Sequence, residues 1–258
     1  MGRAHSGGFA LTTFLENRPN VFLTAFFRSG STHVKATLLN LLPNYRGVTS
    51  VISTGALGND TCAINMFAAQ LLFPTPESVF HQHTLGTHGN AYILKQYNYK
   101  PIVQMRNMLD SMVSVVELLA GGENQNLGIY YPHQFAEMSK DDQLWWAVKN
   151  LPNWYFTFYL SWKYCGLDTH TVWYDIYYKD QVAGVRGILN HVGFSDLGDV
   201  DDETIRMVSE RVTSGSRFKF GLPGRGRQIL TAKMVRDIEM LAMSWMEGKE
   251  LIKELMER

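Results

Sequence analysis

The chain contains 258 residues, and its 24 Lys and Arg are balanced by 24 Asp and Glu. This neutral balance argues against broad binding to nucleic acid or to a membrane surface, which would require an excess of basic residues on one face. With 45% hydrophobic residues and no Pro- or Ser-rich linker, the sequence predicts one globular domain over residues 1–258.

Short apolar runs alternate with longer helical periods along the chain, a pattern typical of a parallel sheet covered by helices. The apolar runs predict strands at Val21–Phe27, Gly47–Ile52 (the weakest), Val79–His83, Ile102–Met105 and Thr171–Tyr174. The helical periods cover Ser31–Leu42, Asp60–Leu72, Met108–Leu119, Gln134–Asn150, Trp154–Tyr164, Val182–Val192, Asp201–Val212 and Thr231–Met256. The predicted fold class is therefore α/β, with a central parallel sheet flanked by helices.

The first strand runs into Arg28-Ser-Gly-Ser-Thr32, at the start of a helical pattern. A Gly/Ser turn lets successive backbone N–H groups point at one spot, and the positive end of the next helix adds to that spot. The segment therefore predicts a cradle for a phosphate or sulfate. It is not a Walker A loop, because it lacks the first glycine at its proper distance and the Gly-Lys-Ser/Thr end. The alternative is a plain strand-to-helix turn in which Ser31 caps the helix.

Ligands of open α/β sheets bind beyond the carboxyl ends of the strands. Applied to the predicted strands, this rule selects Arg28, His81, His83, Arg106 and the neighbourhood of Tyr174. His81 and His83 share one face of a regular strand. No metal is expected there, because no Cys, Glu or third His stands at a supporting spacing.

A second strand end enters a helix at Arg106-Asn107-Met-Leu-Asp110-Ser-Met-Val-Ser114. Arg106 precedes the first turn and Ser114 follows two turns later, so both can face one doubly charged anion. In the alternative interpretation, Asn107 or Asp110 only starts the helix and Ser114 is a small residue packed against the sheet.

A third segment, Lys219-Phe-Gly221-Leu-Pro-Gly224-Arg-Gly-Arg227, combines glycines with three cations between two predicted helices. Glycines let the backbone approach a ligand closely, and Lys219, Arg225 and Arg227 supply charge, which suits a phosphate clamp. A flexible, solvated basic loop is the alternative.

Together and in this order, the three segments resemble the sulfotransferase family that uses 3′-phosphoadenosine 5′-phosphosulfate (PAPS), whose fold is P-loop-NTPase-like. The resemblance spans residues 20 to 230. It implies that the first loop holds the 5′-phosphosulfate, that the Arg and Ser of the second segment bind the 3′-phosphate, and that the third closes over the nucleotide. It also implies that Tyr174 lies near the adenine, with a register uncertain by one because Trp173 precedes it. The implied nucleotide-binding residues are Arg28, Ser29, Gly30, Ser31, Thr32, His33, Arg106, Ser114, Tyr174, Lys219, Phe220, Gly221 and Arg225.

The resemblance further implies a sulfuryl transfer to a hydroxyl or amine, with a strand-end histidine as the base. His83 matches that histidine, and a neutral imidazole can accept the acceptor's proton. The implied catalytic residues are His83, Arg28 and Ser114, with His81 beside them where some members place a second cation. The charge of His81 depends on its burial, and His88 is a second candidate for the base.

Besides His81, three residues depart from the common pattern of the family. Arg28 replaces a lysine, and its permanent charge and bidentate fork suit sulfate and phosphate oxygens. His33 stands in place of a tryptophan that often stacks on the base, and Phe220 stands where a basic residue is common. These two changes either loosen nucleotide binding or substitute stacking for charge.

The acceptor has no specific signature in the sequence. Aromatic segments at residues 129–132, 145–146 and 154–159 can line an apolar acceptor pocket, although aromatic helices of this kind more often belong to the core. Residues 121–128 predict a mobile loop. The expected partner is a small-molecule acceptor, with no nucleic acid, and the sequence leaves homo-oligomers open. A nucleotide-binding or partner-binding module without activity is the alternative function, whereas a magnesium-dependent kinase is disfavoured because the Walker lysine is absent.

The sequence also bears on the cellular setting. Two cysteines, Cys62 and Cys165, are too few for a disulfide framework, which favours a reducing, cytoplasmic setting. The apolar runs are broken well short of the roughly 20 residues that a membrane helix needs, so stable membrane insertion is not expected.

Overall fold

The computed structural model describes residues 20–42, 44–49, 63–64, 74, 77–122, 130–194, 200–215 and 221–258. Within these residues, parallel strands pair in the order β2-β3-β1-β4-β5. The strands are β1 (Val21–Ala25), β2 (Arg46–Thr49), β3 (Ser78–Gln82), β4 (Ile102–Met105) and β5 (His170–Trp173). The predicted α/β class with a central parallel sheet is confirmed.

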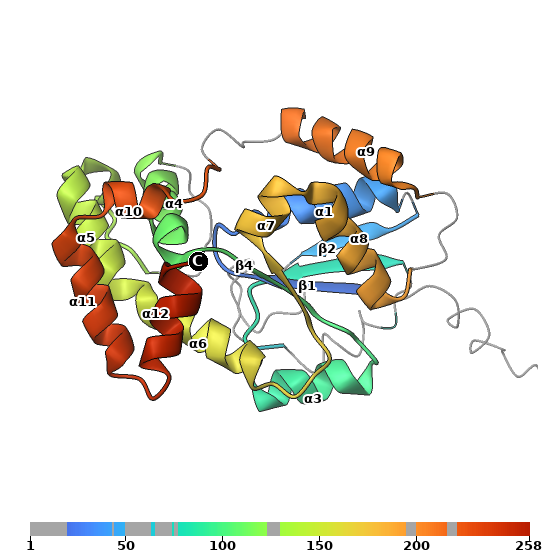
Figure 1. Ribbon diagram of the computed structural model, residues 1–258, viewed down its shortest axis with the longest axis horizontal. Helices are drawn as coiled ribbons and strands as arrows, with labels where there is room; N and C mark the ends of the chain where they lie inside the picture. The colour runs from blue at the N-terminus through green and yellow to red at the C-terminus, as the bar shows by residue number, and fades with distance from the viewer. Residues whose placement is uncertain are drawn as a thin grey trace, which may run out of the picture.

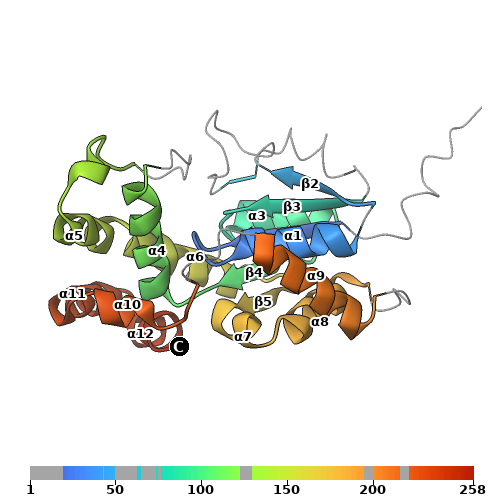
Figure 2. The ribbon, with the colours of Figure 1, turned by 90° about the horizontal axis from the view of Figure 1, so that it is seen from above.

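Helices cover both faces of the sheet and gather beyond the carboxyl ends of β1 and β4 (Figures 1 and 2). In chain order they are α1 (Ser31–Leu41), α3 (His88–Gln96), α4 (Met108–Ala120), a 3₁₀ turn (Phe135–Glu137), α5 (Lys140–Asn150), α6 (Pro152–Lys163), α7 (Tyr174–Lys179), α8 (Gln181–Val192), α9 (Asp202–Gly215), α10 (Arg225–Ile229), α11 (Ala232–Met243) and α12 (Gly248–Met256). No helix of the described ranges is long and apolar enough to cross a bilayer.

The alternation of side chains along β1 explains this layering. Val21 and Leu23 face α1 and α8 in one apolar cluster, while Phe22 faces the other side of the sheet and belongs to the cluster of α3, α4 and α6. β1 is completely buried because it pairs with a strand on each edge. The rigid centre of the sheet therefore fixes the loop that follows Ala25.

Several predicted boundaries were wrong. The region Gln134–Asn150 is not one helix, because Ser139 adopts an extended backbone and its hydroxyl accepts a hydrogen bond from the N–H of Asp142, which starts a new helix. The region Thr231–Met256 breaks between α11 and α12, where Gly248 packs so closely on Ala242 that a Cβ would lie 2.6 Å from its carbonyl oxygen. The helix α3 was not predicted.

The first strand ends at Ala25 rather than Phe27, and the predicted β2 begins at Arg46. Of the predicted helix Asp60–Leu72, only residues 63 and 64 are described, and Ile64 forms a β-bridge instead of a helical turn. The rest of that helix, Cys62 included, and residues 50–52 of the predicted second strand lie outside the described residues, as does most of the loop predicted at 121–128.

Candidate functional site

The loop between β1 and α1 is shaped by two residues in the left-handed region. Arg28 has φ 62° and Gly30 has φ 81°. Gly30 is required for space as well, because a Cβ there would lie 2.6 Å from the Tyr174 ring. Gly30 precedes the first helical residue, and no side chain caps α1. The positive end of α1 therefore points at the loop with its first N–H groups uncapped, which suits an anion.

The interpretation of Ser31 as a helix cap was wrong. Ser31 is the first residue of α1, and its Oγ lies 2.8 Å from Nε2 of His81 on the neighbouring strand. Gln104 of β4 holds the loop from below by donating from Nε2 to the carbonyl of Ser29 at 2.7 Å. The loop is thus braced by both strands that flank β1, while Thr32 is exposed on the first turn of α1.

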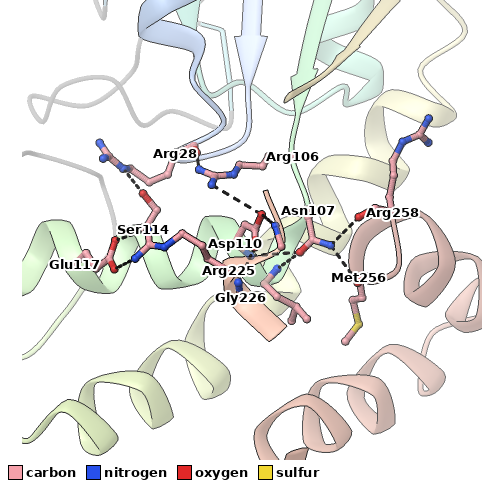
Figure 3. Close-up of polar contacts among 12 residues, drawn as sticks. Arg28, Arg106, Asn107, Asp110, Ser114, Glu117, Arg225, Gly226, Met256 and Arg258 are labelled. Atoms are coloured by element: carbon pink, nitrogen blue, oxygen red, sulfur yellow. Dashed lines mark hydrogen bonds and ion pairs between the residues drawn. The ribbon is translucent and has the colours of Figure 1, made fainter. Parts of the chain in front are cut away.

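Arg106 follows β4 and lies beneath the loop (Figure 3). Its Nη1 donates to the carbonyl of Arg28 at 3.1 Å, its guanidinium stacks 4.5 Å from the centroid of Tyr174, and its Nη2 lies 3.9 Å from Oδ2 of Asp110. Its buried Nε has no hydrogen-bond partner among the described residues. Burial lowers the pKa of Arg106, and Asp110 acts against that change. A buried cation with an unused donor is typical of an anion site.

Arg28 and Ser114 meet above α4, as Figure 3 shows. Nε of Arg28 donates to Oγ of Ser114 at 3.0 Å, although 86 residues separate them in the sequence. The side chain of Asn107 caps α4 by accepting from the N–H groups of Leu109 and Asp110, as the alternative interpretation of this segment had it for Asn107. The first two predicted segments therefore converge on one side of α4.

The described part of the third predicted segment also packs on α4, as a turn and a short helix. Residues 219 and 220 lie outside the described part of the chain, and Gly221 lies in the turn before α10. Arg225 begins the short helix α10 rather than a solvated loop, and its Nη2 donates to Oε1 of Glu117 at 2.6 Å. The turn packs on α4 because the N–H groups of Gly224 and Gly226 bond the carboxylate of Asp110.

His83 follows β3 and lies against the aromatic ring of Phe27. Its Nδ1 lies 2.7 Å from the carbonyl of Ala25, and because a carbonyl only accepts, Nδ1 carries the proton. Desolvation lowers the pKa of His83 to about 4, while the bond to Ala25 acts in the opposite direction. His83 is therefore neutral at physiological pH, with the lone pair on Nε2.

His81 is buried beside His83, with the two ring centroids 5.6 Å apart. Burial holds its pKa well below the usual range, and the neighbouring His83 and Lys35 lower it further. His81 is thus neutral and braces Ser31, so it does not supply a cation. In the described ranges no group of three or more potential metal-ligating side chains occurs. His88 starts α3 and is exposed.

The residues expected on the adenine side lie in different places. Tyr174 is buried against Gly30 and Arg106, whereas Trp173 packs under Arg258 with its ring centroid 4.2 Å from the guanidinium carbon. Of the two registers, the one with Tyr174 brings the tyrosine to the phosphate loop. His33 is buried, and its ring nitrogens hydrogen-bond Tyr177 at 2.9 Å and Thr213 at 3.0 Å.

A row of contacting aromatic rings begins at His83. The ring of Phe27 lies 4.6 Å from the His83 ring, and half-buried Trp154 stacks on Phe27 at 4.0 Å. The neighbouring Tyr155 and Phe158 are completely buried, so most of the aromatic segment 154–159 belongs to the core as its composition favoured. Sequence reasoning missed Phe27 and Gln104 as parts of the site. Their places at the ends of the first and fourth strands were the only available signal.

Comparison with known proteins supports the fold. No protein-family model and no curated protein matches the sequence. Mouse sulfotransferase SULT7A1 complexed with PAP, the 3′,5′-adenosine bisphosphate, is similar in structure with a TM-score of 0.62 and 19% identity, over 92% of this chain and 89% of that chain. Retinol dehydratase in complex with androsterone and the inactive cofactor PAP gives a TM-score of 0.55 at 15% identity, over 93% and 83% of the two chains. These similarities show that the chain has the sulfotransferase fold.

Proposed function

We propose that the chain is a sulfotransferase that moves a sulfuryl group from PAPS to a hydroxyl or amine of a small-molecule acceptor. The observation that carries this proposal is the convergence, at the carboxyl ends of adjacent strands, of an uncapped helix N-terminus, two arginines and a neutral histidine. The sulfotransferase fold supports it, because the structural neighbours are complexes with PAP.

The residues of the loop and of α4 fit a nucleotide with phosphates at two places. The 5′-phosphosulfate would lie on the Gly30 turn, where the first N–H groups of α1 are directed, with the nearby Arg28 as its cation. The 3′-phosphate would lie on Arg106 and Ser114, and the unpartnered Nε of Arg106 is the donor that such an anion would satisfy. Tyr174 borders both places because its ring contacts Gly30 and Arg106.

His83 is the proposed base. The carbonyl of Ala25 fixes the tautomer with the proton on Nδ1, which leaves Nε2 to accept the proton of the acceptor. The low pKa keeps nearly all His83 unprotonated at neutral pH, at the expense of basic strength. Proton acceptance then depends on the bond between the acceptor oxygen and sulfur, which acidifies the hydroxyl as it forms.

Arg28 is the proposed cation for the leaving group. PAPS, when bound, supplies an activated sulfuryl group whose departure leaves negative charge on a phosphate oxygen. An arginine stays charged throughout and cannot act as an acid, so Arg28 would stabilise that charge electrostatically. Its hydrogen bond to Ser114 links the arginine proposed for the 5′-phosphosulfate to a residue proposed for the 3′-phosphate.

The acceptor would approach His83 along Phe27 and Trp154. These rings contact one another in a row that starts at the base, and half-buried Trp154 gives the row an aromatic surface. Such a surface favours an acceptor whose hydroxyl is attached to an apolar or flat ring, since aromatic stacking and apolar burial would orient it.

Binding and transfer are tested separately. We expect PAP at a hundred times its Kd to stabilise the protein by about 2.7 kcal/mol, and Arg106→Ala to remove most of this effect. Arg186→Ala is the control, because Arg186 of α8 forms an ion pair with exposed Asp202 of α9. Mass spectrometry of a PAPS reaction with a panel of phenols, alcohols and amines then detects sulfated product. Stabilisation without any product, unchanged by His83→Ala, would support the inactive nucleotide-binding module instead.

A further inference from the structure

Asp110 stands between the two residues proposed to bind the 3′-phosphate. Asp110 and Ser114 are four residues apart and lie along one face of α4, and Arg106 precedes the first residue of that helix by two positions. Figure 3 shows Asp110 pointing toward Arg106 on one side and toward the turn of α10 on the other. Its side chain is 1% exposed, and that of Arg106 is 6% exposed.

Both carboxylate oxygens of Asp110 are fixed by backbone donors. Oδ2 accepts from the N–H of Gly224 at 2.8 Å, and Oδ1 accepts from the N–H of Gly226 at 2.6 Å. Backbone amides cannot change rotamer, so the negative charge beside Arg106 is held in place more rigidly than a carboxylate bound by side chains. The turn that carries the two amides lies 114 and 116 residues away in the sequence.

Close packing keeps the turn on α4. A Cβ on Gly226 would lie 2.4 Å from the carbonyl carbon of Leu109, so only glycine lets the two backbones approach this closely. Farther along α4, Glu117 accepts from both Nη1 and Nη2 of Arg225. Asp110 and Glu117 therefore attach α10 at two points that flank Ser114.

Asp110 orients Arg106 without occupying its donors. The closest approach, from Nη2 to Oδ2, is 3.9 Å, which is an ion pair and too long for a hydrogen bond. Nε has no hydrogen-bond partner in the described part of the chain. The carboxylate thus stabilises the buried positive charge and leaves the guanidinium able to bind an anion.

Resting on the proposed function, we infer that Asp110 is a positioning residue that sets the preference for a nucleotide with a 3′-phosphate. It does so by holding Arg106 in register with the turn of α10. By thermodynamic reciprocity, an anion on Arg106 stabilises the bonds from Gly224 and Gly226 to Asp110. The preference for PAP over 5′-AMP is therefore a property of this contact between α4 and α10.

The first experiment compares Kd values for PAP and 5′-AMP by calorimetry in wild type and Asp110→Asn. Asparagine has one acceptor oxygen and no charge, so we expect PAP binding to weaken at least tenfold while 5′-AMP binding stays within twofold. Asp237→Asn, which removes the carboxylate that pairs with exposed Lys233 on α11, is the matched control and leaves both affinities unchanged. A general loss of structure would weaken both ligands together. An unchanged ratio of the two affinities in Asp110→Asn overturns the inference, whereas failure of wild-type protein to bind PAP overturns the proposed function.

The second experiment does not depend on the folding of Asp110→Asn. Hydrogen exchange of the Gly224 and Gly226 amides is followed by NMR or fragment mass spectrometry in wild type and Arg106→Ala. We expect saturating PAP to slow exchange about tenfold in wild type, 5′-AMP to leave it unchanged, and Arg106→Ala to lose the protection even at saturating PAP. Equal protection by both nucleotides, or protection that persists in Arg106→Ala, contradicts the coupling.

Discussion

The neutral state of His83 makes a quantitative prediction about stability and pH. Its pKa falls from 6.5 to about 4 on folding, mainly through desolvation. Below pH 6.5 the unfolded chain binds a proton at this residue and the folded chain does not, so the free energy of unfolding falls as the pH falls. Between pH 6.5 and pH 4 this proton binding lowers the free energy of unfolding by about 3 kcal/mol, of which about 2 kcal/mol is lost between pH 6.5 and pH 5.

The substitution His83→Asn isolates this contribution. The Asn amide can donate to the carbonyl of Ala25 in place of Nδ1, but it does not titrate and offers no counterpart of Nε2. We expect wild-type protein to lose about 2 kcal/mol more than His83→Asn between pH 7 and pH 5. The variant is less stable at pH 7 because it loses ring contact with Phe27, so the comparison concerns the change with pH and not the absolute value.

Urea unfolding followed by tryptophan fluorescence at pH 7, 6 and 5 measures the difference, and His88→Asn, at an exposed position on α3, serves as the control. In His83→Asn we also expect kcat to fall by about 10² to 10⁴ with unchanged PAP affinity, as for removal of a general base. The reasoning is refuted if His83→Asn shows the wild-type dependence on pH, because His83 would then not be a buried neutral imidazole. Unchanged kcat would refute its role as the base.

Two further predictions concern the loop and the acceptor surface. Gly30→Ala forces a side chain into the left-handed region and against Tyr174, so we expect a stability loss of about 1–3 kcal/mol and no thermal shift with PAP. Gly89→Ala is the control: a Cβ there meets open space, so this variant keeps the wild-type stability and the thermal shift with PAP. Trp154→Leu removes the ring stacked on Phe27, so we expect the KM of aromatic acceptors to rise about tenfold, in line with the worth of one stacked pair, with PAP affinity unchanged. Steady-state kinetics of Trp154→Leu with one phenol and one aliphatic alcohol measures this effect, and an equal change in KM for both acceptors contradicts a stacking role.

Local patterns in the sequence were sufficient for the sheet and for the segments around Arg28 and Arg106. An apolar run followed by a Gly/Ser turn or by Asn-x-x-Asp is a short-range signal; β4 ends where it indicates, and β1 ends two residues earlier than predicted. Helix ends were less predictable, because Ser139 and Gly248 interrupt helical periods that continue on both sides. Neither residue disturbs the apolar pattern, so the periodicity alone did not reveal the breaks.

Contacts between distant segments could not be predicted from the sequence. Gln104 supports the loop across 75 residues, and Asp110 meets the α10 turn across more than a hundred. Neither contact leaves a spacing pattern, since each depends on the register of strands and on the packing of glycine against a helix backbone. The sequence singled out Asp110 and Gly224 separately, but only the folded chain brings them together.

Burial assigns opposite electrostatic roles to the arginine and the histidines of one site. Desolvation lowers the pKa of Arg106 and of His83 alike. The ordinary pKa of an arginine is far above neutral pH, and Arg106 has Asp110 beside it, so it remains a cation, whereas the pKa of His83 starts from 6.5 and falls to about 4. The pKa of His81 is also lowered, mainly by burial, and the neighbouring His83 and Lys35 lower it further. The same dry environment therefore holds one fixed positive charge and one neutral imidazole, to which the proposed function assigns the phosphate and the acceptor's proton. The sequence alone left the charge of His81 open because that charge depends on burial.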